Sequence, residues 1–202
     1  MLQFIYMQLS SLLANKKLIF IFIGTILLAE LVWAGLSLFG GKTQDNTKVS
    51  PGQSKASSTL SLNASKTSLK VGESVTVAIN VSSSVATDGM DVILSYDPKL
   101  LSVTLGLGKI PVAVGTIYSD YPLNQVDEGA GRIAVSGITS QAGGIIARGM
   151  VGAVTFTAKA PGKAKIAFDF TPGSTTDSNV IETKTAQDIL GSVTDLEVNI
   201  TP

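Results

Sequence analysis

The sequence contains no cysteine and no histidine. Without cysteine, a disulfide framework and a thiolate metal site are both excluded. Without histidine, the commonest general base, the Ser-His-Asp triad and the usual zinc ligands are missing as well. Catalysis would have to rely on carboxylates, lysine or tyrosine alone. The composition therefore predicts a protein that is not an enzyme and that carries no cofactor.

The sequence also lacks an excess of charge of either sign. Its 202 residues include 15 Lys and Arg and 15 Asp and Glu. Proteins that bind DNA or RNA normally show a basic excess, so no nucleic-acid partner is expected.

A long apolar run is present near the start of the chain. Residues 18–39 are apolar except for three polar positions, and about 20 such residues match the hydrocarbon thickness of a bilayer. Lys16 and Lys17 precede the run, so the positive-inside rule places residues 1–17 in the cytoplasm. We expect residues 18–39 to be a transmembrane signal anchor in the lipid bilayer. The protein would then be a single-pass cell-membrane protein with an extracellular remainder.

A cleaved signal peptide is the alternative interpretation of this run. Val32-Trp33-Ala34 offers small residues typical of a cleavage site, which would place the cut after Ala34. An h-region usually has 7–15 residues and this run is longer, which favours the uncleaved anchor. Both interpretations export the rest of the chain.

Beyond the anchor the pattern changes twice. Residues 40–59 are polar and rich in Ser, Thr, Gly and Lys, which is typical of a flexible linker. Residues 60–202 show short runs of alternating apolar and polar residues, divided by Gly, Pro, Asp and Asn. Val75, Val77 and Ile79, for example, alternate with polar or small neighbours, as expected of a half-buried strand. We predict an all-β fold: an antiparallel two-sheet β-sandwich of about nine strands, jelly-roll type.

The stretch Met90–Val103 is the most informative part of this region. Met90, Val92, Leu94 and Tyr96 alternate with outward residues, and Asp97-Pro98 then ends the strand. We expect the Asp97 side chain to cap the turn.

This stretch and its neighbours resemble the cohesin family, the β-sandwich modules of cellulosome scaffolds. The resemblance spans about residues 60–202 and is carried by VGESVTVAINV, GMDVILSYDPKLLSV with its Tyr-Asp-Pro corner, GRIAVSGI, GMVGAVTFTAK and APGKAKI. It implies binding rather than catalysis, because cohesins hold dockerins, small Ca²⁺-loaded helical modules, on the flat outer face of one sheet. Asp91 matches an acidic residue that contributes to that face. Gly89 stands where dockerin-binding members often have Asn.

The alternation of the two strands defines a candidate contact face for a dockerin-like protein partner. If the apolar residues point inward, the outward ones are Asp91, Ile93, Ser95, Arg132, Ala134 and Ser136. An exposed Ile with one charge of each sign suits a protein partner. The alternative is that Ile93 is an isolated surface residue and that Asp91 only protects the sheet.

A carbohydrate-binding module is a second hypothesis, with a polysaccharide as partner. Sugar-binding sandwiches usually present coplanar aromatic rings, yet residues 60–202 contain no tryptophan. Tyr118, Asp120 and Tyr121 could line a small loop site. A purely structural cell-surface domain is the third hypothesis. The acids of the loop expected at residues 119–131 could hold Ca²⁺, but no calcium-loop motif is present and no metal site is predicted.

Overall fold

The computed structural model describes residues 56–174 and 176–202. The predicted cytoplasmic segment, the predicted anchor and most of the predicted linker lie outside these residues. Within the described part of the chain, no helix is long and apolar enough to cross a membrane. The prediction of a transmembrane anchor therefore stays a prediction.

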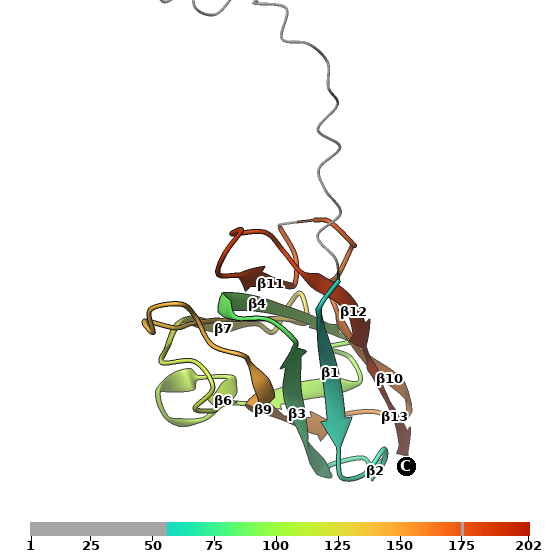
Figure 1. Ribbon diagram of the computed structural model, residues 1–202. Coiled ribbons are helices and arrows are strands. Elements are labelled where there is room, and N and C mark those ends of the chain that lie inside the picture. Colours follow the sequence, from blue (N-terminus) through green and yellow to red (C-terminus); the bar gives the residue numbers. More distant parts are fainter. Residues whose placement is uncertain (1–55, 175) are drawn as a thin grey trace, which may run out of the picture. The chain divides into compact units, whose positions relative to one another are not determined.

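The described residues form two packed β-sheets, which confirms the predicted all-β sandwich (Figure 1). The first sheet has the order β12 (Leu190–Thr194), β1 (Ser58–Ala64), β3 (Ser74–Ser83), β9 (Arg148–Ala158) and β5 (Leu101–Thr104), with β6 (Val112–Val114) also paired to β9. The second has the order β2 (Ser68–Lys70), β13 (Leu196–Thr201), β10 (Gly162–Phe168), β4 (Thr87–Tyr96), β8 (Arg132–Ile138) and β7 (Asp120–Asp127), with β11 (Asn179–Glu182) also paired to β4. A single 3₁₀ turn, η1 (Leu107–Lys109), accompanies the strands in this part of the chain.

The core lies between the sheets and follows from the period of two in the sequence. Strand β3 buries Val75, Val77, Ile79 and Val81, and β4 buries every second residue from Met90 to Tyr96. The ring of Tyr96 meets that of Phe156 edge to face, with centroids 5.3 Å apart and planes at 69°. The alternating runs thus form a shared apolar interior that holds both sheets together.

The described residues contain thirteen strands rather than the predicted nine, and not all pairs are antiparallel. Strands of three residues, such as β2 and β6, are too short to give a periodic signal. Residues 120–127 form strand β7 instead of the predicted loop, because they pair with β8 at the edge of the second sheet. Strands β1 and β12, and likewise β2 and β13, pair in parallel.

The corner after β4 forms as predicted. The Asp97 side chain accepts a hydrogen bond from the Lys99 amide at 2.8 Å, and the Asp97 carbonyl accepts from the amides of Leu100 and Leu101. Gly131 faces this corner with φ +65°, and its carbonyl accepts a hydrogen bond from the Tyr96 amide. The corner therefore leads directly from β4 in one sheet to β5 in the other.

Candidate functional face

The six residues of the predicted contact face come together as three cross-strand pairs on the outer side of the second sheet. Strands β4 and β8 are antiparallel, and their register places Asp91 opposite Ser136, Ile93 opposite Ala134, and Ser95 opposite Arg132. The residues between them on β4 and β8, such as Val92 and Val135, point into the core. The alternation therefore decides which residues face outward, and the register brings the two strands' residues together.

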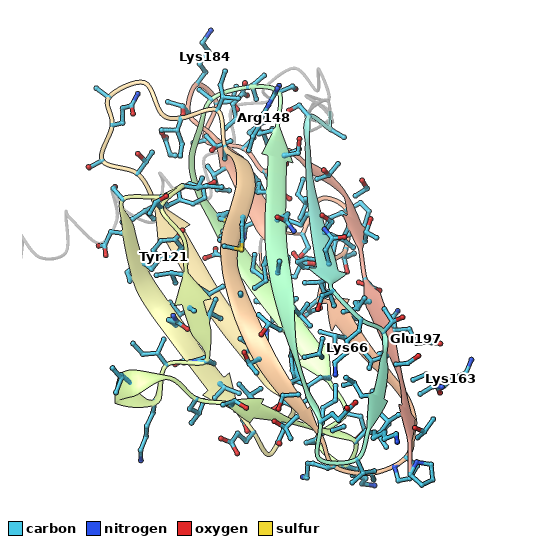
Figure 2. The ribbon with its side chains drawn as sticks, turned by 90° about the horizontal axis from the view of Figure 1, so that it is seen from below. Lys66, Tyr121, Arg148, Lys163, Lys184 and Glu197 are labelled. Carbon is cyan, nitrogen blue, oxygen red and sulfur yellow. The ribbon has the colours of Figure 1, made fainter. Side chains whose placement is uncertain are left out.

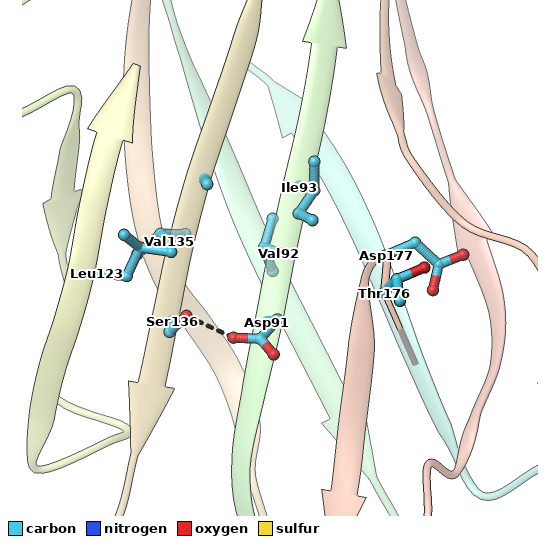
Figure 3. A pocket seen from close by; sticks show the side chains of 9 residues that line it. Asp91, Val92, Ile93, Leu123, Val135, Ser136, Thr176 and Asp177 are labelled. Carbon is cyan, nitrogen blue, oxygen red and sulfur yellow. Dashed lines mark hydrogen bonds between the residues drawn. The ribbon is translucent and has the colours of Figure 1, made fainter. Parts of the chain in front are cut away.

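Hydrogen bonds from two neighbouring strands hold the Asp91 carboxylate. The Ser136 hydroxyl donates to Oδ1 from β8, in a short hydrogen bond (Figure 3). The Asn179 amide donates to Oδ2 at 3.1 Å from β11. A carboxylate can accept about four hydrogen bonds, so Asp91 keeps acceptor capacity for another group.

Strands β10 and β11 pair with different parts of β4, and Ile93 lies in the gap between the two. Strand β10 pairs with β4 up to Phe168 opposite Leu94, and β11 begins with Asn179 opposite Asp91. The Ser178 hydroxyl accepts a hydrogen bond from the Ile93 amide at 3.0 Å and donates to the Ile93 carbonyl at 3.1 Å. Ser178 thereby gives the Ile93 amide its partner, and the Ile93 carbonyl also accepts a hydrogen bond from the Asp169 amide at 2.8 Å.

We expect Ser178→Ala to lower the free energy of unfolding by about 1–2 kcal/mol, because the Ile93 amide loses its partner. Ser174→Ala is the matched control, since Ser174 is partly exposed and its hydrogen bonds stay within its own loop. Its effect should stay within about 0.5 kcal/mol. Urea unfolding followed by circular dichroism measures both variants. Equal stabilities of the two variants would show that Ser178 does not support Ile93.

The face contains a shallow depression of about 220 Å³ beside Asp91 and Ile93. Figure 3 shows its lining side chains, which come from β4, β8, β7 and the segment before β11: Asp91, Val92, Ile93, Leu123, Ala134, Val135, Ser136, Thr176 and Asp177. Reasoning from the sequence missed Leu123, Thr176 and Asp177. Leu123 was assigned to a loop, and no local pattern places residues 176 and 177 next to a strand about 85 positions earlier.

Arg132 lies at the end of the face and is already paired. Its guanidinium lies 3.5 Å from the Asp169 carboxylate, and both side chains are about half exposed, at 51% and 52%. Such an exposed pair contributes little to stability, and it neutralises the one arginine of the predicted face. Ser95, opposite Arg132, is exposed and donates a long hydrogen bond to the Ala167 carbonyl at 3.5 Å.

The prediction that Tyr118 lines an accessible sugar-binding loop is wrong, because its side chain is buried. Tyr118 is only 2% exposed, its hydroxyl pairs with that of Thr87 at 3.2 Å, and burial raises the pKa of its phenol. The backbone of Gly137 makes room for the ring, since a Cβ there would lie 2.8 Å from the Tyr118 ring. A buried ring cannot stack on the face of a sugar.

The other two residues of that hypothesis do not form a stacking platform either. Tyr121 is partly buried, is perpendicular to Tyr118, and donates its hydroxyl to the Val151 carbonyl at 3.1 Å. Asp120 is exposed and accepts a hydrogen bond from the Tyr121 amide. In the described ranges, no group of three or more acidic side chains is placed to hold a metal ion.

The fold defines this protein as a two-sheet β-sandwich module, with a shallow depression on the outer face of its second sheet. The family model described as the Cohesin domain matches residues 59–200. The chain therefore belongs to the cohesin domain family. No curated protein matches the sequence.

Several solved structures share the fold. A type II cohesin domain from the cellulosome of Acetivibrio cellulolyticus is 21% identical, with a TM-score of 0.59 over 71% of this chain and 95% of that chain. The sixth cohesin of scaffoldin B from Acetivibrio cellulolyticus, solved in complex with a mutant Cel5 dockerin, is 19% identical, with a TM-score of 0.54 over 72% of this chain and 99% of that chain. A type I cohesin–dockerin complex from Clostridium thermocellum is 17% identical, with a TM-score of 0.52 over 71% of this chain and 99% of that chain.

Proposed function

We propose that the sandwich docks a dockerin-like protein module on the outer face of β4 and β8. The observation that carries this proposal is the arrangement of the three cross-strand pairs, which place Asp91, Ile93 and Ala134 on one open face above the core. Membership of the cohesin family supports it, and so do the dockerins bound in two of the similar structures.

The chemistry of the face suits a protein partner. Ile93, Leu123 and Ala134 offer apolar area at the centre, where desolvation supplies affinity. The Asp91 carboxylate and the exposed ion pair of Arg132 surround this area and would orient the partner. The site combines apolar and hydrogen-bonding groups on a shallow, open surface, and this arrangement supports binding of a partner.

A binding assay tests this function. Residues 51–202 form a compact unit, and isolated cohesin domains of the same fold have been crystallised. This fragment would be immobilised and exposed to a panel of purified dockerin modules, including the Cel5 dockerin, with a dockerin-free module from the same host as control. Saturable binding of at least one dockerin is expected. If none binds and insoluble polysaccharide retains the fragment instead, the docking function is wrong.

We further propose that residues 18–39 hold this module at the outer surface of the cell membrane. The support is the length of the apolar run and the two lysines before it. The full chain should stay in the membrane fraction after alkaline extraction, and external protease should remove the sandwich. A soluble product beginning just after Ala34 would show cleavage instead.

A further inference from the structure

The acidic side chains on the proposed docking face are not balanced by basic ones. The outer surface formed by β7, β8, β4 and the described part of the segment that joins β10 to β11 carries one arginine, Arg132, and three aspartates, Asp91, Asp127 and Asp169, while Asp177 is buried in that segment. Of these four aspartates, only Asp169 makes an ion pair with a described residue. The chain as a whole is neutral, so this is a local excess of negative charge.

Basic side chains on the neighbouring strand do not compensate for it. Lys163 and Lys165 of β10 already pair with Glu197 and Asp195, at 3.5 Å and 2.8 Å (Figure 2 labels Lys163 and Glu197). Each pair is neutral overall, so neither lysine is left over to balance the aspartates of the face.

The depression places one of these carboxylates beside an apolar surface. Its lining includes the side chains of Ile93, Leu123 and Ala134, with the Asp91 carboxylate next to them (Figure 3). The Ser136 and Asn179 hydrogen bonds fix the orientation of that carboxylate. Asp177, which is 5% exposed, lies in the wall, and its Oδ1 has no hydrogen-bond partner within the described ranges. An apolar surface next to a fixed, unneutralised carboxylate matches a side chain with an aliphatic stem and a cationic end.

We propose that the depression receives a lysine or arginine side chain from the docked partner, with its stem on Ile93, Leu123 and Ala134 and its charge on Asp91. This inference rests on the proposed docking function, because it names the chemistry of the partner at that face. Arginine would form two parallel hydrogen bonds to a carboxylate, whereas lysine would act as a point charge. The excess negative charge would also attract a basic partner from a distance.

A titration with small probes tests the inference without a macromolecular partner. The ¹⁵N-labelled fragment 51–202 would be titrated with the N-acetyl amides of arginine and lysine. N-acetyl-norleucine amide, which has a similar aliphatic stem without charge, and N-acetyl-glutamine amide are the controls. The two basic probes should shift the amide resonances of residues 91–93 and 134–136, and norleucine should shift them much less. Equal shifts with norleucine, or no shifts with either basic probe, would overturn the proposal.

A matched pair of variants identifies the carboxylate. Asp91→Asn keeps the shape and can keep both hydrogen bonds, because its oxygen can accept from Asn179 and its amide can donate to Ser136. It should weaken binding of the basic probes about threefold or more. Asp120→Asn, at the end of β7 and outside the depression, should leave it unchanged. If both variants bind the basic probes equally, Asp91 is not the receiving group.

The same variants separate this inference from the docking function. If a dockerin binds wild-type and Asp91→Asn protein equally, and high salt does not slow its association, the proposal of a basic side chain is wrong. The docking function would still stand. If the basic probes bind but no dockerin does, the proposal of a dockerin-like partner is wrong. The proposal that the depression binds a basic side chain would still stand.

Discussion

The double substitution Asp91→Lys with Ile93→Asp is expected to weaken binding of a dockerin module at least about a hundredfold. The first change reverses a charge on the acidic face, and the second places a carboxylate where apolar contact should supply affinity. Ile93 and Asp91 lie side by side on the outer side of β4, so one partner surface would meet both changes. Biolayer interferometry with the immobilised fragment measures the dissociation constant.

A control pair on the opposite sheet tests whether the effect is local. Thr76→Lys with Ala78→Asp introduces the same two side chains at outward positions of β3, in the other sheet. This variant should bind as the wild type does, and circular dichroism should show that both variants remain folded. If the β4 variant is folded and keeps its affinity, the proposed face is wrong. If the β3 variant alone loses binding, the partner docks on the other sheet.

Phe156→Ala is expected to lower the free energy of unfolding by about 4 kcal/mol. Phe156 is fully buried on β9, between β3 and β5 in the first sheet, and its ring contacts that of Tyr96 from the second sheet. Its removal takes away the largest fully buried side chain and one aromatic contact between the two sheets. Domains of this size are stable by only about 5–15 kcal/mol, so the variant should unfold at a much lower urea concentration.

Leu107→Ala is the control for this prediction. Leu107 is 98% exposed on the 3₁₀ turn, so its truncation removes apolar area without opening a cavity. Its effect should stay within about 0.5 kcal/mol, as measured by urea unfolding of the fragment 51–202. A Phe156→Ala variant as stable as Leu107→Ala would show that the core between the two sheets does not depend on this ring.

The outward side of β4 was predictable because its signal is local. Two residues on the same strand, such as Asp91 and Ile93, share a face whenever their neighbours are buried, and alternation in the sequence shows which are buried. The pairing of β4 with β8 was not readable in the same way, since those strands are about 40 residues apart and their register depends on the folded sheet. The sequence nevertheless identified the outward residues of each strand.

The burial of Tyr118, by contrast, was not predictable, because its signal is not local. Tyr118 and Tyr121 stand in a segment with weak periodicity, where a loop and an edge strand look alike. Only packing against Gly137 and the hydrogen bond to Thr87 show that the Tyr118 ring belongs to the core. The glycine gave no indication of this partner, because nothing in its local sequence points to a residue 19 positions earlier.

The sequence by itself determined the class of this fold, the inward and outward sides of β3, β4, β8 and β9, and the capped corner at Asp97. These features depend on periodicity and on the backbone limits of proline, which act over a few residues. The tertiary structure alone decided how Ser178 and Asn179 support Ile93 and Asp91, and where Leu123 and Asp177 complete the depression. Those contacts join residues far apart in the chain, and only the pairing of strands in the sheet brings them together.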